Sequence, residues 1–106
     1  MKFEYDDTVY TLCTRVRTYY NNNNLAIEII CWNEEDGYEP FAMLTVNTQT
    51  KLPANQAAVD TNNFPEAIQL IEEYRLGIPT GDYVYSGYCK YPVYEFNIQE
   101  LKDYAL

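Results

Sequence analysis

The sequence predicts an α+β fold, with an antiparallel sheet of about five or six strands, one main helix packed across one face and a possible short C-terminal helix. Two patterns carry this prediction. Apolar residues recur at strong helical spacing only within Asp60–Gly77, whereas Leu25–Trp32 alternates in the manner of a strand. A length of 106 residues predicts one domain, residues 1–106, because domains of roughly 100 to 150 residues are the commonest.

The N-terminal half is predicted to form strands in antiparallel pairs. Phe3–Tyr5 and Thr8–Tyr20 form a hairpin across Asp6 and Asp7. Leu25–Trp32 is predicted to be the central strand, because one of its faces is apolar and the other is mostly apolar, as in a strand that is covered on both sides. Its antiparallel partner is Phe41–Val46.

Two polar segments of this half are predicted to be loops. Asn21–Asn24 is a turn or a mobile loop, because asparagine tolerates turn conformations and offers no packing surface. Asn33–Pro40 places four carboxylates around Gly37. It is predicted to form an acidic tip between the central strand and its partner, made of Glu34, Glu35, Asp36 and Glu39.

The main helix is predicted from roughly Asn63 to Leu76. Asn63 suits the N-cap because its side chain accepts from free backbone N–H groups, and Pro65 fits the first turn. Gly77 is predicted in the left-handed position that follows a helix. The stripe that should face the sheet is Phe64, Ala67, Ile68, Ile71 and Tyr74.

The rest of the chain is predicted as strand, turn and a last helix. Ile78–Asp82 is a turn by composition, and Tyr83–Lys90 with Tyr91–Phe96 is one long interrupted strand or a tight pair. Gly87 suggests a bulge and Pro92 an edge position within that pair. A short helix over Ile98–Tyr104, capped by Asn97, follows.

Charge limits the partners that the protein can have. The sequence contains 16 acidic and 7 basic residues and no histidine, so the net charge is −9. Such a surface repels phosphate backbones and anionic membranes, so neither nucleic acid nor a membrane is an expected partner. The expected partner is a basic protein. The alternative that the charge only maintains solubility stays open.

The expected compartment is the cytoplasm. No signal sequence and no apolar run of about 20 residues is present. The odd number and wide spacing of Cys13, Cys31 and Cys89 favour reduced thiols over disulfides.

No catalytic residue, metal or cofactor is expected. Without histidine, the usual triads are excluded, and the cysteines lack zinc-binding spacing. The glycines form no nucleotide-binding loop. Paired carboxylates, as in glycosidases, remain available, although a chain of this length leaves little room for a sugar cleft. The acidic tip lacks the pattern of a calcium loop.

Several short motifs cover most of the chain after Phe41. They are Leu44-Thr45-Val46-Asn47, Leu52-Pro53, Ala58-Val59-Asp60-Thr61-Asn62-Asn63 with Pro65-Glu66-Ala67, Leu76-Gly77 with Pro79-Thr80-Gly81, Ser86-Gly87, Cys89, Tyr91-Pro92 and Tyr94-Glu95-Phe96. With these motifs the chain resembles an uncharacterised family of small bacterial proteins carried on plasmids and conjugative elements. The resemblance implies a cytoplasmic bacterial protein with a role in element maintenance or evasion of host defence, and it implies no catalytic residue.

The expected function is a non-catalytic acidic interaction module that binds a basic protein. A short nucleic-acid mimic that inhibits a DNA-binding or defence enzyme is the alternative, and a small carboxylate enzyme is the third hypothesis. Strand parity prevents all the C-terminal rings from pointing inward, so at least two tyrosines should face solvent. The candidate interaction residues are Tyr83, Tyr85, Tyr88, Tyr91 and Tyr94, on a sheet face or edge with acidic residues at its rim, together with Glu34, Glu35, Asp36 and Glu39 of the acidic tip. The sequence predicts no oligomeric state.

Overall fold

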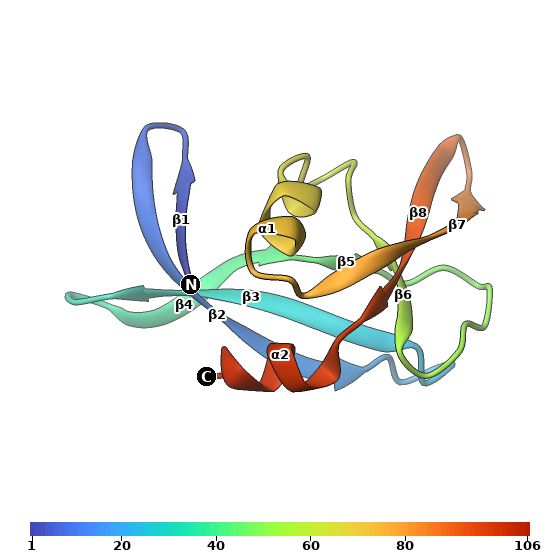
Figure 1. The fold of residues 1–106 in the computed structure, drawn as a ribbon, viewed down its shortest axis with the longest axis horizontal. Helices are drawn as coiled ribbons and strands as arrows, with labels where there is room; N and C mark the ends of the chain where they lie inside the picture. Colours follow the sequence, from blue (N-terminus) through green and yellow to red (C-terminus); the bar gives the residue numbers. More distant parts are fainter.

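The computed structural model describes residues 1–106 and contains two antiparallel sheets of four strands each, with two short helices (Figure 1). The first sheet has the order β1-β2-β3-β4, formed by β1 (Lys2–Tyr5), β2 (Thr8–Thr18), β3 (Leu25–Asn33) and β4 (Gly37–Met43). The second has the order β5-β6-β8-β7, formed by β5 (Thr45–Val46), β6 (Gln56–Val59), β7 (Gly77–Ser86) and β8 (Cys89–Phe96). The helices are α1 (Ala67–Glu73) and α2 (Ile98–Asp103). Neither helix is long and apolar enough to cross a membrane.

The predicted α+β arrangement of one sheet under a main helix is therefore wrong. The two sheets separate at Leu44, where the predicted strand Phe41–Val46 divides into the end of β4 and the short β5. The N–H of Leu44 donates to the carbonyl of Ile27 in β3, and its carbonyl accepts from the N–H of Asp60 at the end of β6. Leu44 thus links both sheets. The alternation of apolar residues in the sequence does not reveal this link.

The main core lies between the sheets and is closed by both helices. Its members include Ile27 and Ile29 from β3, Val59 from β6, and Leu101 from α2, all with no exposed area. Burying each such aliphatic side chain contributes about 1.5 to 3 kcal/mol. A smaller cluster on the opposite face of the second sheet contains Ala58, Val84, Tyr91 and Val93, with Leu52 packed against it.

Helix α1 has 7 residues, about half the predicted length. Asn63 is not its cap, because the Asn63 amide and backbone N–H donate to the carboxylate of Asp60. Glu66 occupies the N-cap without a side-chain hydrogen bond. Ile68, which the predicted stripe placed inward, is only partly buried, and the buried face of the helix is Ala67, Leu70 and Ile71.

The left-handed residue after α1 is Arg75, with φ +54°, and not Gly77 as predicted. The N–H of Leu76 donates to the carbonyl of Ile71 at 2.9 Å, which is the longer bond of a Schellman motif. Leu76 and Ile71 are both completely buried, so an apolar contact accompanies this chain reversal. Gly77 is instead the first residue of β7.

Gly77 is required by the close approach of β8. A Cβ at this position would lie 2.8 Å from the carbonyl oxygen of Glu95 and 3.2 Å from the Cα of Phe96, both backbone atoms. We expect Gly77→Ala to lower the free energy of unfolding by about 1 to 3 kcal/mol, as overpacking typically does. Urea unfolding measures this, with Ile78→Ala as the control because Ile78 is 63% exposed. A Gly77→Ala protein as stable as the parent would contradict the contact.

The segment Ile78–Asp82, predicted as a turn, lies inside β7. The β7–β8 register shifts between Pro79 and Tyr83, where Gly81 adopts φ +89°. Local composition predicted a chain reversal, but the pairing of Gly77 with Phe96 and of Ser86 with Cys89 keeps the segment in one bent strand.

The β7–β8 pair also corrects two smaller predictions. Gly87 is a turn residue with φ +59°, not a bulge, because Ser86 pairs with Cys89 across a two-residue loop. Pro92 does not lie on an edge strand, since β8 is between β6 and β7. The proline is tolerated because β6 pairs with Val93–Glu95 only and therefore stops short of it.

The predicted turn at Asn21–Asn24 is present. It is not a mobile loop, because its side chains form several hydrogen bonds to the segment before β6. Asn24 is only 4% exposed. Its Nδ2 donates to the carbonyl of Thr50 at 2.9 Å, and its Oδ1 accepts from the N–H of Leu52 at 3.0 Å. The side-chain amide of Asn22 donates to the carbonyl of Thr48 at 3.1 Å. These asparagines hold the loop before β6 against the first sheet.

Residues from both ends of the chain line the free edge of β2. The N–H of Leu12 donates to the carbonyl of Met1, and the N–H of Thr14 donates to the carbonyl of Tyr104 at 2.9 Å. The hydroxyl of Thr14 donates to the carbonyl of Leu101 at 2.6 Å. Helix α2, which brings these last residues to β2, begins at the predicted cap Asn97, whose Oδ1 accepts from the N–H of Glu100 at 3.2 Å.

Candidate functional site

The predicted interaction residues lie at opposite ends of the molecule. Figure 1 shows the β1–β2 and β3–β4 turns toward one end of the long axis, which measures 39 Å, and the β7–β8 turn toward the other. Glu34, Glu35, Asp36 and Glu39 therefore do not lie at the rim of the candidate tyrosines. The two groups are separate surfaces with different chemistry.

The acidic end is formed by the turns of two hairpins. In the β3–β4 turn Glu34, Glu35 and Asp36 are exposed, and Glu39 is exposed on β4. The β1–β2 hairpin adds three carboxylates that sequence reasoning did not include. The acidic end is thus Glu4, Asp6, Asp7, Glu34, Glu35, Asp36 and Glu39, all of them exposed.

Local backbone geometry explains why these turns carry acids. Asp6 and Asp7 adopt φ +52° and +63°, a conformation that aspartate and asparagine tolerate better than most residues. In the second turn, the Asn33 side chain accepts from the N–H of Glu35 at 2.8 Å, and Gly37 takes φ +75°. The carboxylates are left free to face solvent.

The charge of the acidic end is not compensated within the protein. The structure contains one ion pair, Arg15 with Glu28 at 3.5 Å, and it involves none of the seven carboxylates. Lys2 is the only basic residue within segments 1–11 and 32–40, and its ammonium donates to the hydroxyl of Thr11. The end therefore projects a concentrated negative potential.

Two aromatic rings that sequence reasoning missed flank the acidic turn. Trp32 and Tyr38 are a cross-strand pair of β3 and β4, with ring centroids 4.8 Å apart. Trp32 is 44% exposed and Tyr38 is 54% exposed. The available signal was their position, since Trp32 directly precedes the predicted acidic segment Asn33–Pro40 and Tyr38 lies within it. Amphipathic rings of this kind are enriched in protein interfaces.

The five candidate tyrosines divide into exposed and buried groups. Tyr83, Tyr85 and Tyr88 are exposed, whereas Tyr91 and Tyr94 are each 6% exposed. Tyr94 belongs to the main core and Tyr91 to the smaller cluster. Burial raises the pKa of Tyr94, and the neighbouring thiol of Cys89 together with burial raises the pKa of Tyr91. These two phenols stay neutral packing groups at physiological pH.

The exposed tyrosines form a surface with one lysine. The ammonium of Lys90 lies 4.0 Å from the ring centroid of Tyr83 and 6.0 Å from that of Tyr85. This is the geometry of a cation–π contact, which at an exposed site is worth roughly 0.5 to 1 kcal/mol. We call Tyr83, Tyr85, Tyr88 and Lys90 the tyrosine tip.

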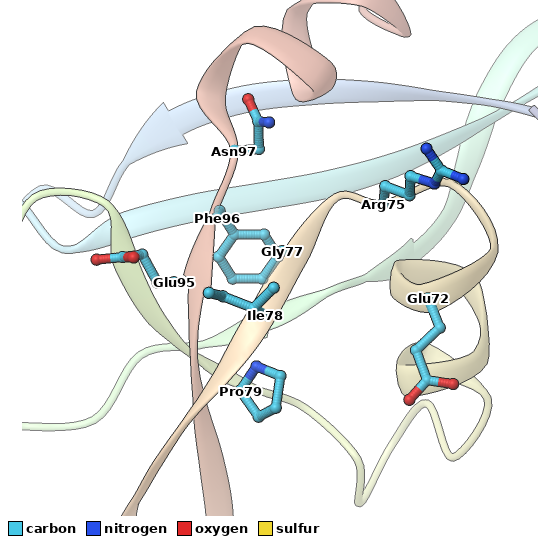
Figure 2. Close-up of a pocket in the computed structure, with 8 residues that line it drawn as sticks. All are labelled: Glu72, Arg75, Gly77, Ile78, Pro79, Glu95, Phe96 and Asn97. Carbon is cyan, nitrogen blue, oxygen red and sulfur yellow. The ribbon is translucent and has the colours of Figure 1, made fainter.

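The largest hollow has a volume of about 670 Å³ and contains no predicted site residue. It lies between the end of α1 and the start of β7, and Ile78, Pro79 and Phe96 contribute its apolar lining (Figure 2). Glu72 and Glu95 extend to opposite sides of the β7–β8 pair in Figure 2, so the two carboxylates do not converge as a paired acid and base would.

The cysteines of the protein are dispersed, and its acidic side chains do not converge on one point. No three His, Cys, Asp or Glu side chains come together as a metal-binding group. Cys13, Cys31 and Cys89 are all free. Cys13 pairs with Ile30 on β3 while Cys31 pairs with Leu12, so these two thiols lie on opposite faces of the first sheet.

Comparison with known proteins assigns the chain to a family. A domain of unknown function (DUF4313) matches residues 13–106. The chain belongs to this family. No curated protein and no solved structure matches it. The family match includes the β3–β4 turn and the tyrosine tip, and it begins within β2, so Glu4, Asp6 and Asp7 lie outside it.

Proposed function

We propose that this protein is a non-catalytic interaction module whose acidic end binds a basic protein. The observation that carries the proposal is the gathering of seven exposed carboxylates on two hairpin turns without an internal counter-ion. Complementary charge raises association rates and excludes wrong partners. The exposed pair Trp32 and Tyr38 supplies apolar contact area beside that charge.

The setting that we propose is the cytoplasm of a bacterium that carries a mobile genetic element. The support is the resemblance of the motifs after Phe41, such as Tyr94-Glu95-Phe96, to small proteins of plasmids and conjugative elements. A partner encoded by the host or by the element fits this setting equally.

A nucleic-acid mimic is the second candidate, and the clustering of the carboxylates at one end favours it. Duplex DNA carries one charge per about 1.7 Å of its axis, so seven carboxylates match the charge of roughly 12 Å of duplex. Only a short mimic of this kind is possible. Its target would be a DNA-binding protein, which is itself basic.

Neutralising the acidic turn tests the proposal. The triple variant Glu34→Gln, Glu35→Gln, Asp36→Asn keeps the size of each side chain and removes three charges. We expect it to weaken partner binding about tenfold at about 0.1 M salt, where the Debye length is about 10 Å. Raising the salt to about 1 M, where that length is about 3 Å, should release the partner from the parent protein. Affinity capture from a bacterial lysate, followed by titration of the identified partner, measures both effects.

The matched control is Glu72→Gln, Glu73→Gln, Asp103→Asn, which removes the same charge elsewhere on the exposed surface. It should bind the partner nearly as the parent does. If both triple variants weakened partner binding equally, the loss would depend on net charge alone. That result would contradict the proposal that the acidic end is the binding surface. Displacement of the partner by a short duplex oligonucleotide would favour the mimic.

A further inference from the structure

The sheet edges differ in how they are protected against pairing with another strand. The edge strand β1 carries Lys2 and Glu4, and β4 carries Glu39 and Pro40. The third edge, β5, has only two residues. Charge, proline and short length are the usual devices that prevent edge-to-edge association. The longest stretch without charge or proline on an edge strand is Tyr83–Ser86 of β7, and the corresponding stretch of β4, Phe41–Met43, is shorter.

The outward backbone groups of this stretch belong to Tyr83 and Tyr85. Ser86 pairs with Cys89 across the two-residue loop, and such a closing pair bonds within the hairpin. Alternation then directs Val84 toward β8 and leaves the N–H and C=O groups of Tyr83 and Tyr85 on the free edge. Pro79 also faces the free edge, because the N–H of Asn97 donates to the carbonyl of Leu76 and alternation from this pair directs Pro79 outward. A residue without an N–H suits such a position.

We propose that a second copy of this chain pairs with β7 at this edge, antiparallel, about a two-fold axis at Val84. Tyr83 of each copy then faces Tyr85 of the other, and their outward backbone groups bond to each other. The arrangement is isologous, because the same three residues, Tyr83, Val84 and Tyr85, contribute from both copies. Cross-strand tyrosine pairs extend the tyrosine tip into one continuous aromatic surface.

Charge supports a second copy as the occupant of this edge. Each chain carries −9, so two copies repel unless they meet far from most of their carboxylates. The β7–β8 turn lies toward the end of the long axis opposite the β3–β4 turn (Figure 1). Within residues 82–92 the single carboxylate, that of Asp82, is balanced by the single cation, that of Lys90. A dimer through the tyrosine tip therefore leaves both acidic ends apart and free for partner binding. Because the interface is small, the dimer is weak, with a dissociation constant in the micromolar to millimolar range.

Sedimentation velocity over a concentration series tests this at low and high salt. We expect the average mass to rise toward twice that of the monomer, and more steeply at high salt because screening reduces the repulsion. Binding of a basic partner has the opposite salt dependence, so the two interactions are distinguishable. Amide hydrogen exchange should show that Tyr83 and Tyr85 gain protection with concentration, while Val84 and Ser86 are protected throughout.

Two variants locate the interface. Tyr85→Pro removes an outward N–H without a loss of β8 pairing, and Tyr85→Lys brings two like charges together; each should raise the dissociation constant at least tenfold. Tyr88→Lys is the control, because Tyr88 lies in the turn and outside the pairing. Circular dichroism confirms that each variant is folded. A protein that stays monomeric at high concentration and high salt would overturn the proposal, as would self-association that Tyr85→Lys leaves unchanged.

Discussion

Replacing Tyr94 with alanine should lower the free energy of unfolding by about 3 to 5 kcal/mol, the usual cost of deleting a core aromatic ring. Tyr94 is 6% exposed and packs in the main core, where its ring centroid lies 6.5 Å from that of Phe96. Domains of this size have only about 5 to 15 kcal/mol of total stability. Tyr94→Ala is therefore expected to be near the limit of folding.

The other four tyrosines provide the matched series. Tyr91→Ala should also be costly, because its ring is buried beside Val84 and Val93. Tyr85→Ala and Tyr88→Ala should each stay within about 0.5 kcal/mol of the parent, as surface changes do. Tyr83→Ala also loses the contact with Lys90 and should cost no more than about 1 kcal/mol. Urea unfolding at low protein concentration measures all five without interference from self-association. A costly result at Tyr88, which is fully exposed, would be incompatible with this structure.

Asn24→Ala is expected to lower the free energy of unfolding by about 2 to 4 kcal/mol. The change leaves the carbonyl of Thr50 and the N–H of Leu52 without their partner, and each unsatisfied group costs about 1 to 3 kcal/mol when buried. The loop before β6 should then detach from the first sheet and uncover the cluster around Leu52. Faster amide exchange at Leu52 would show the detachment directly.

The control for this asparagine is Asn62→Ala. Asn62 is exposed and its side chain makes no hydrogen bond within the protein, so the change should stay within about 0.5 kcal/mol. Equal losses from Asn24→Ala and Asn62→Ala would show that the Asn24 bonds contribute nothing specific.

Sequence patterns predicted correctly those elements that are determined by residues close together in the sequence. The hairpin around Asp6 and Asp7, the strand over Leu25–Trp32 and the cap at Asn97 all depend on neighbours in the sequence. The predicted helix failed because Phe64 and Tyr74 fit its stripe although neither is helical. Phe64 lies in a turn that Asp60 stabilises, and that turn delays the start of α1.

Non-local pairing accounts for the larger error in the fold. β5 has two residues and pairs with β6, and nothing in the sequence of Thr45–Val46 separates it from β4. The alternation of side chains along Tyr83–Phe96 correctly implies that its aromatic rings divide between the two faces of the sheet. Parity does not show that this hairpin extends beyond the core at Tyr88, nor that it lies at the end of the molecule opposite the acidic turns.

The contacts along the β2 edge have a consequence for the order of folding. Thr14 bonds to Leu101, which is 87 residues away in the sequence, and Ala105 forms a parallel bridge with Thr14. Closing so long a loop costs chain entropy before any contact compensates for it. Domains dominated by such distant pairings fold in milliseconds to seconds, far more slowly than small helical bundles. During synthesis on the ribosome, β2 cannot acquire its native edge until residues 101–105 have emerged, so this part of the fold must form after all the other strands have been made.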